Sequence, residues 1–157
     1  MGASRQQQIL EDLRRQIRQI ERRPDRRIGV LPSGRPEVDA MLPGGGFPCG
    51  SITSLVGGPA SGKTQLALCA LRQAQVGGAL AAFVDGRSEL YPPAALALGV
   101  DLARLLIVRP RTERRGRQAA RQETVAGLWA AEALLTSGAF AAVAVDVPLC
   151  FLPGTGA

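Results

Sequence analysis

Residues 57–64 read Gly57-Gly58-Pro59-Ala60-Ser61-Gly62-Lys63-Thr64 and fit the pattern G-x-x-x-x-G-K-[ST]. Loops of this pattern wrap nucleotide phosphates with backbone N–H groups, and their glycines allow positive φ and close approach of the backbone to a ligand. A helix that begins at the end of the loop adds further N–H groups and a favourable dipole. The octapeptide and the following Gln65 are therefore the predicted phosphate-binding segment.

Lys63 is the only lysine among the nineteen basic residues of the chain. A compact ammonium reaches between two phosphate groups, where a forked guanidinium fits poorly. We therefore expect Lys63 to be a catalytic residue that bridges the β- and γ-phosphates of a bound nucleotide, and the Thr64 hydroxyl to coordinate Mg²⁺. The alternative is a glycine-rich turn that contains Gly-Lys-Thr by chance, and it does not explain why lysine is kept only here.

Short apolar runs alternate with helical segments on both sides of this loop. The alternation predicts a three-layer α/β/α domain with a mainly parallel sheet. The expected strands are residues 51–56, 80–84, 105–108 and 140–145. The expected helices are residues 63–75, 93–98 and 122–136. Before the first strand we expect a short strand at 28–31, a brief helix at 36–42 and a loop at 43–48.

An acidic residue follows the last expected strand. Residues 140–145 are apolar and end at Asp146. This arrangement can place a carboxylate beside Mg²⁺ through a water molecule, so Asp146 is the second expected metal ligand. The alternative is an ordinary aspartate that caps a turn. Asp85, after the expected strand 80–84, is a further acid of less certain role.

The N-terminal segment carries apolar residues at helical spacing. Residues 4–23 predict a helix with one narrow apolar stripe, and Pro24 ends it. The stripe consists of Leu10, Leu13, Ile17 and Ile20. Such a stripe suits docking on another copy of the chain, as in a homo-oligomer, or on the body of the same domain. The expected division is a basic amphipathic helix and linker (1–26) and a nucleotide-binding domain (27–157).

The formal net charge of +6 is concentrated in two segments. Residues 1–35 carry nine arginines against four acids, and residues 109–121 carry six arginines against one glutamate. This distribution indicates contact with a polyanion, or simply two solvated segments. In the first case, the loop arginines would bind phosphates of single-stranded DNA without sequence specificity. They are Arg109, Arg111, Arg114, Arg115, Arg117 and Arg121.

Aromatic residues add little to a nucleic-acid reading. Trp129 lies in an amphipathic segment, where packing in the core is its expected use. No apolar run approaches the ~20 residues of a membrane helix, and the polar N-terminus does not resemble a secretory signal. The cysteines Cys49, Cys69 and Cys150 form no C-x-x-C pair. We therefore expect a cytoplasmic protein with reduced thiols and no membrane contact.

Several motifs outside the octapeptide resemble the RecA-type recombinase ATPases. Leu31-Pro32-Ser33-Gly34, Val38-Asp39 and the run from Pro43-Gly44-Gly45-Gly46-Phe47-Pro48 to Ile52 resemble that family's lead-in to its first core strand. Phe83-Val84-Asp85 and Leu98-Gly99-Val100-Asp101 resemble the segment around its second strand. Within this superfamily, residues 105–110 and 128–140 look most like ImuA, an accessory factor of damage-induced translesion synthesis. The resemblance covers about residues 31–146.

The resemblance implies a RecA-like P-loop core that is shortened at its C-terminal end and binds ATP and Mg²⁺. It further implies a role in DNA damage repair, with a translesion polymerase or RecA as protein partner. Two functions of different class remain open. The first is a DNA-stimulated ATPase, and the second is a protein-interaction adaptor in which nucleotide is only a structural ligand.

One departure from the family concerns catalysis. RecA-type enzymes carry a catalytic glutamate two residues after the position that corresponds to Asp85, and this chain has Arg87 there. An arginine does not accept a proton at neutral pH. Glu89 is the remaining candidate base, although its displacement by two residues alters the geometry of the step. The departure predicts slow ATP turnover.

Overall fold

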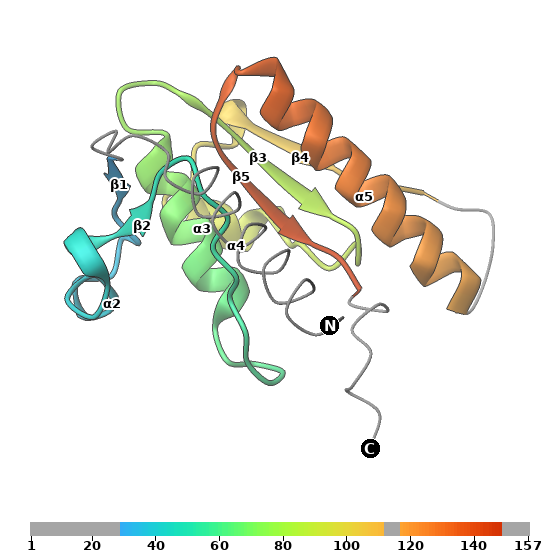
Figure 1. Cartoon of the computed structure of the whole chain (residues 1–157), viewed down its shortest axis with the longest axis horizontal. Coiled ribbons are helices and arrows are strands. Elements are labelled where there is room, and N and C mark those ends of the chain that lie inside the picture. Colours follow the sequence, from blue (N-terminus) through green and yellow to red (C-terminus); the bar gives the residue numbers. More distant parts are fainter. Residues whose placement is uncertain (1–28, 112–116, 149–157) are drawn as a thin grey trace, which may run out of the picture.

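The computed structural model describes residues 29–111 and 117–148 of the 157-residue chain. Its larger sheet contains three parallel strands in the order β4-β3-β5 (Figure 1). The strands are β3 (Leu80–Asp85), β4 (Leu105–Val108) and β5 (Phe140–Asp146). Their parallel pairing places the carboxyl ends of all three strands at one edge, and the register sets Asp85 opposite Asp146. An α/β domain with a parallel sheet is thereby confirmed.

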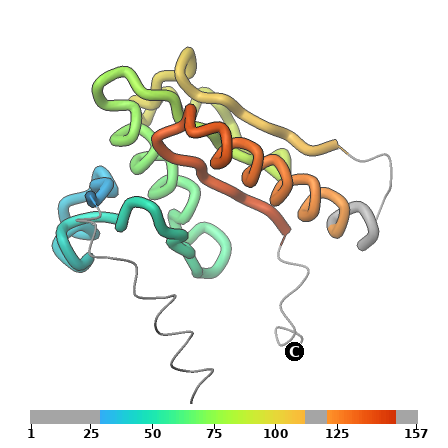
Figure 2. The backbone as a smooth tube through the Cα atoms, turned by 45° about the horizontal axis from the view of Figure 1, so that its top comes forward, coloured from blue at the N-terminus to red at the C-terminus, as the bar shows by residue number. Residues whose placement is uncertain are grey.

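Helices cover both faces of this sheet. The helices α3 (Lys63–Ala74) and α4 (Pro92–Ala97) cover one face, where Leu68 and Leu71 of α3 join Phe83 of β3 in the hydrophobic core. The helix α5 (Arg117–Ser137) lies along the other face, as Figures 1 and 2 show. At Gly127 of α5 an added Cβ would lie 2.7 Å from Val147 Cγ1, so glycine permits the close approach. The strand β3 is thus buried between two helical layers.

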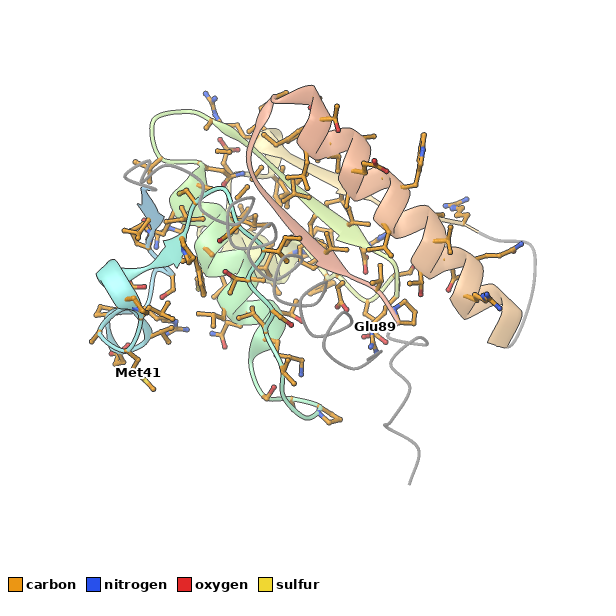
Figure 3. All side chains as sticks on the ribbon, viewed as in Figure 1. Met41 and Glu89 are labelled. Atoms are coloured by element: carbon orange, nitrogen blue, oxygen red, sulfur yellow. The ribbon has the colours of Figure 1, made fainter. Side chains whose placement is uncertain are left out.

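A second, smaller sheet precedes the phosphate-binding segment. It pairs β1 (Val30–Leu31) with β2 (Phe47–Pro48) in antiparallel fashion, and α2 (Pro36–Asp39) and the 3₁₀ helix η1 (Pro43–Gly45) lie between them. The expectation that residues 43–48 form only a loop is therefore wrong. Gly46 explains the tight packing, because an added Cβ would lie 2.6 Å from the Leu31 carbonyl oxygen. Met41, beyond α2, is largely exposed (Figure 3).

The expected strand at residues 51–56 is absent from the described structure. The segment is irregular, and Ile52 and Val56 are 95% and 90% exposed. The apolar, β-branched composition is that of a buried strand, but a strand also needs a neighbour that accepts its backbone hydrogen bonds. No described strand pairs with this segment, so its composition alone does not make it a strand.

The other expected elements are confirmed with small changes of boundary. The helix α3 ends at Ala74, with Gln75 as its C-cap, and α5 begins five residues before the expected residue 122. A further 3₁₀ helix, η2 (Leu102–Arg104), follows Asp101, whose side chain accepts a hydrogen bond from the Ala103 N–H. The predicted helix at residues 4–23 and the division of the chain at residue 26 lie outside the described residues and remain predictions.

The outer surface of α5 carries large apolar side chains. Trp129 is 70% exposed, which corrects the expectation that it packs in the core. The helix turns the small residues Gly127 and Ala131 toward the sheet instead, because only small side chains fit the short distance between the layers. The exposed apolar residues of this helix are Val125, Leu128, Trp129 and Leu135.

A buried carboxylate holds the turn between β3 and α4. The Asp85 side chain is 1% exposed and forms an ion pair with Arg109, with 2.9 Å between Oδ2 and Nε. It also accepts hydrogen bonds from the backbone N–H groups of Glu89 (3.0 Å) and Leu90 (3.1 Å). Arg109 in turn donates to the Leu90 carbonyl oxygen at 2.7 Å. These four interactions tie the end of β3 to residues 89 and 90, and so they fix the turn.

We predict that Arg109→Met lowers the free energy of unfolding by about 2–3 kcal/mol, because it leaves the buried Asp85 carboxylate without its counter-charge. Urea unfolding measures the loss. The matched control is Arg111→Met, two residues further on and exposed, where we expect a change within about 0.5 kcal/mol. Equal losses in the two variants would contradict the structural role assigned to Arg109.

Candidate nucleotide site

The phosphate-binding segment forms a loop that leads directly into α3. Lys63 is the first residue of this helix, and Gly62 at its N-cap has the left-handed conformation (φ 83°) that favours glycine. Ala60 is also left-handed (φ 57°), which costs a non-glycine residue about 1–2 kcal/mol. No side chain caps the helix, and its first N–H groups have no partner within the helix. The N-terminal end of α3 therefore offers hydrogen-bond donors to an anion.

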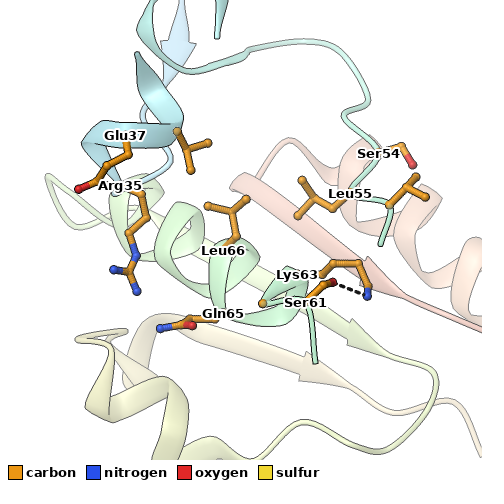
Figure 4. Close-up of a pocket in the computed structure, with 11 residues that line it drawn as sticks. Arg35, Glu37, Ser54, Leu55, Ser61, Lys63, Gln65 and Leu66 are labelled. Atoms are coloured by element: carbon orange, nitrogen blue, oxygen red, sulfur yellow. Dashed lines mark hydrogen bonds between the residues drawn. The ribbon is translucent and has the colours of Figure 1, made fainter. Parts of the chain in front are cut away.

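The Lys63 ammonium lies inside the loop. It donates hydrogen bonds to the carbonyl oxygens of Gly57 (2.8 Å) and Gly58 (2.6 Å) and to Ser61 Oγ (3.0 Å; Figure 4). An added Cβ at Gly57 would lie 2.7 Å from Ser61 Oγ, so glycine is needed for this close fold. A phosphate group entering the loop has to compete with these three acceptors for the ammonium.

Two cavities lie on either side of the start of α3, and Gln65 lines both. The first, of about 560 Å³, is bounded by Lys63 and Ser61 and by the irregular segment before the loop (Figure 4). The second, of about 500 Å³, brings together Thr64, Glu89 and Asp146. Three residues that the sequence placed at the site from separate segments thus line one cavity.

The second cavity also has an apolar part, which was not predicted from the sequence. Its wall contains Tyr91, Ala94, Ala97 and Leu98, of which Tyr91 is largely exposed. These residues belong to α4 and its two ends, which the Asp85 cluster holds against the sheet. The signal in the sequence was weak, because a single tyrosine before two prolines is typical of many helix starts.

Asp146 is already paired with a cation of the protein. Its Oδ1 lies 3.2 Å from Arg87 Nε, and both side chains are partly exposed. The Thr64 hydroxyl and the Asp146 carboxylate are oxygen ligands of the type that Mg²⁺ prefers. The described residues contain no group of three or more His, Cys, Asp or Glu side chains that could hold a metal ion. The residues therefore fit Mg²⁺ only with oxygens supplied by a phosphate and by water.

Glu89 and Asp85 have different positions although both are acids near the end of β3. Asp85 uses both carboxylate oxygens within the protein, so it is not available as a further metal ligand. The Glu89 side chain is exposed and lines the cavity near the end of β5 (Figure 3). Its place beside Thr64 and Asp146 is compatible with the predicted role as a base, which remains a prediction.

The six loop arginines do not form one described surface. Arg109 is engaged by Asp85 and Leu90, whereas Arg111 is exposed. Arg117 begins α5, and Arg121 lies exposed in its second turn. Arg114 and Arg115 lie outside the described residues. A DNA contact by this segment therefore remains a prediction. In the described part of the chain, no helix is long and apolar enough to cross a membrane.

Comparison with known proteins identifies the family. Residues 9–155 match the RecA N-terminal domain. The chain is 37% identical over 137 residues to Protein RecA of Enterococcus gallinarum, covering 87% of this chain and 36% of that protein. It is 40% identical over 133 residues to Protein RecA of Corynebacterium urealyticum (85% and 32%) and 39% identical over 130 residues to that of Thermus aquaticus (83% and 35%).

The chain spans about a third of the length of these curated relatives. The match nevertheless covers nearly all of this chain and includes the phosphate-binding loop, the parallel sheet and the helices on both of its faces. The chain belongs to the RecA family and corresponds to its N-terminal domain.

Proposed function

We propose that this chain binds Mg·ATP, hydrolyses it slowly and acts in DNA repair. One observation carries the proposal: the chain's only lysine lies in a glycine-rich loop at the start of α3, next to a cavity lined by Thr64, Glu89 and Asp146. A lysine, a hydroxyl and a carboxylate around the N–H groups of a helix start are the groups that bind the phosphates and Mg²⁺ of a nucleoside triphosphate.

In the proposed complex, the phosphates occupy the loop from Gly57 to Thr64. The N–H groups at the start of α3 and the Lys63 ammonium donate to phosphate oxygens, which replace the present acceptors Gly57, Gly58 and Ser61. The adenine ring of the nucleotide lies toward the apolar part of the second cavity, where Tyr91 offers an aromatic face. Thr64, and Asp146 through water, would hold Mg²⁺, which would neutralise phosphate charge when bound.

Glu89 is the proposed base for hydrolysis. Its carboxylate lines the same cavity as Thr64, and it would accept a proton from a water that attacks the terminal phosphate. Lys63 would stabilise the charge that develops on the phosphate oxygens. Because the Glu89 backbone is held by Asp85 and its side chain is exposed, water is excluded poorly from this position. Slow turnover follows.

The repair role rests on the family and on charge. The relatives are RecA proteins, and the finer resemblance to ImuA suggests an accessory role in translesion synthesis beside a polymerase or RecA. Single-stranded DNA would contact the arginine-rich segment from residue 109 to 121 through its phosphates.

A protein-interaction adaptor is the second candidate, and the surface of α5 favours it. The exposed residues Val125, Leu128, Trp129 and Leu135 form an apolar stripe along this helix, with spacings of three, one and six residues. Exposed large apolar residues in a row often mark a protein contact. In this reading nucleotide stabilises the fold without turnover, so the rate of phosphate release separates the two functions.

We predict that Lys63→Ala lowers the affinity for Mg·ATP at least about tenfold, because hydrogen bonds to charged groups contribute about 1.5–3 kcal/mol. Calorimetric titration of the purified protein measures it. Arg72→Ala, on the exposed side of α3, is the matched control and should leave the affinity unchanged. Absence of ATP binding by the wild-type protein, or full affinity in Lys63→Ala, would overturn the proposed function.

We predict that Glu89→Gln lowers the rate of phosphate release at least about tenfold while ATP affinity changes little, because general-base catalysis typically contributes 10²–10⁴-fold. The assay compares release with and without single-stranded DNA, with Lys63→Ala as the background. A wild-type rate in Glu89→Gln would exclude Glu89 as the base. A wild-type rate no higher than that of Lys63→Ala would favour the adaptor.

Neutralising four loop arginines (Arg111, Arg114, Arg115 and Arg117, each to Gln) should weaken binding of single-stranded DNA and reduce its salt dependence. The slope of log K against log salt should fall by about 0.7 for each lost phosphate contact. Arg109 is left unchanged because it stabilises the fold. Fluorescence anisotropy at several salt concentrations measures both quantities, with Arg72→Gln as control. Unchanged affinity and slope would remove the DNA contact from this segment.

A further inference from the structure

Asp146, the predicted magnesium ligand, forms an ion pair with Arg87. The Asp146 carboxylate lines the cavity that also contains Thr64, and Arg87 Nε lies 3.2 Å from its Oδ1. A positive charge of the protein therefore stands against the carboxylate that would support a bound Mg²⁺.

The backbone around Arg87 accounts for this position. Asp85 and Asp146 are register partners at the ends of β3 and β5, and the Gly86 N–H donates to the Asp146 carbonyl oxygen at 2.7 Å. An added Cβ at Gly86 would lie 2.9 Å from Val147 Cγ1, so the two strand ends are in close contact. The chain then turns through Ser88 (φ 56°), whose N–H donates to the Asp85 carbonyl oxygen at 3.2 Å.

The buried Asp85 side chain also holds this turn. Asp85 binds the Glu89 and Leu90 N–H groups and Arg109. The segment that carries Arg87 is consequently fixed at both ends, and its side chain starts next to Asp146. The strand register and the Asp85 cluster thus place the backbone of Arg87 next to Asp146. The ion pair follows from this placement of the backbone.

The charges at this site depend on Arg87. With the pair intact, the carboxylate and the guanidinium together carry no net charge. Without Arg87 the Asp146 carboxylate is an unpaired negative charge, in addition to that of Glu89, in a cavity that would receive a triphosphate, and the repulsion favours Mg²⁺ there. In the wild-type protein Mg²⁺ and its bound water have to compete with the guanidinium for the Asp146 carboxylate.

We infer that Arg87 is a built-in cation at the Asp146 carboxylate, which competes with Mg²⁺ and makes nucleotide binding less dependent on this ion. The inference rests on the proposed nucleotide binding. It assigns Arg87 a positioning role, since the guanidinium acts through Asp146. Phosphates bound at Lys63 would then require less magnesium for the same affinity than in a site with a free carboxylate.

The test is titration with AMP-PNP, a poorly hydrolysed ATP analogue, by calorimetry in excess Mg²⁺ and in EDTA. The measured quantity is the ratio of the Kd in EDTA to the Kd in Mg²⁺. We expect this ratio to be about two- to fivefold larger in Arg87→Ala than in the wild-type protein, within the range that partly exposed ion pairs support. Arg87→Lys keeps the cation and should keep a ratio close to the wild-type value.

Two further variants exclude a general effect of charge or folding. In an Asp146→Asn background, Arg87→Ala should change the ratio by less than about twofold, because the pair no longer exists to be broken. Arg104→Ala removes another partly exposed ion pair of the same length, Arg104 Nε to Asp101 Oδ2 at 3.2 Å, which lines neither cavity. It should leave the ratio unchanged. Circular dichroism and urea midpoints confirm that each variant is folded.

The outcomes separate the inference from the function on which it rests. Nucleotide binding with the same ratio in the wild-type protein and Arg87→Ala would overturn the inference and leave the proposed function standing. An equal rise of the ratio in the Asp146→Asn background would also overturn it. Absence of binding by the wild-type protein under both conditions would overturn the proposed function, and the inference with it.

Discussion

The arrangement of the site depends on one buried carboxylate, that of Asp85. It lies at the end of the central strand, where both neighbouring layers cover it, and it is satisfied by two backbone N–H groups and by Arg109. A buried charge with fewer partners would be strongly destabilising, so this set of bonds is kept as a whole. Through it, the positions of Arg87, Glu89 and the start of α4 are fixed relative to β5.

The same cluster separates structural from functional charge at the edge of the sheet. Asp85 faces inward and supports the turn, whereas Glu89 and Asp146 face the cavity beside Thr64. Among the arginines, Arg109 serves the fold and Arg87 faces Asp146. Residues of the same type near this edge therefore have different uses, because each use depends on whether the side chain faces the interior, as that of Asp85 does, or the cavity, as those of Glu89 and Asp146 do.

The phosphate loop is held together by its own lysine. Three oxygens of the loop accept hydrogen bonds from the Lys63 ammonium, although Ala60 is left-handed and residues 51–56 pair with no described strand. The hydrogen bonds of Lys63 thus stabilise loop backbone that makes no hydrogen bonds to a described strand. Phosphate binding would replace these bonds by hydrogen bonds in which donor and acceptor are both charged, so the ammonium that holds the loop would also hold the ligand.

The sequence alone determined the phosphate-binding pattern, the parallel α/β alternation and the strand-end acid Asp146, because each depends on local spacing and composition. It failed for residues 51–56 and for Trp129. Their apolar character indicates burial, but only the neighbouring elements decide whether a partner strand or a covering layer exists. The pairing of Arg87 with Asp146, and of Arg109 with Asp85, was likewise decided by the tertiary structure, since it follows from the register of strands that lie far apart in the chain.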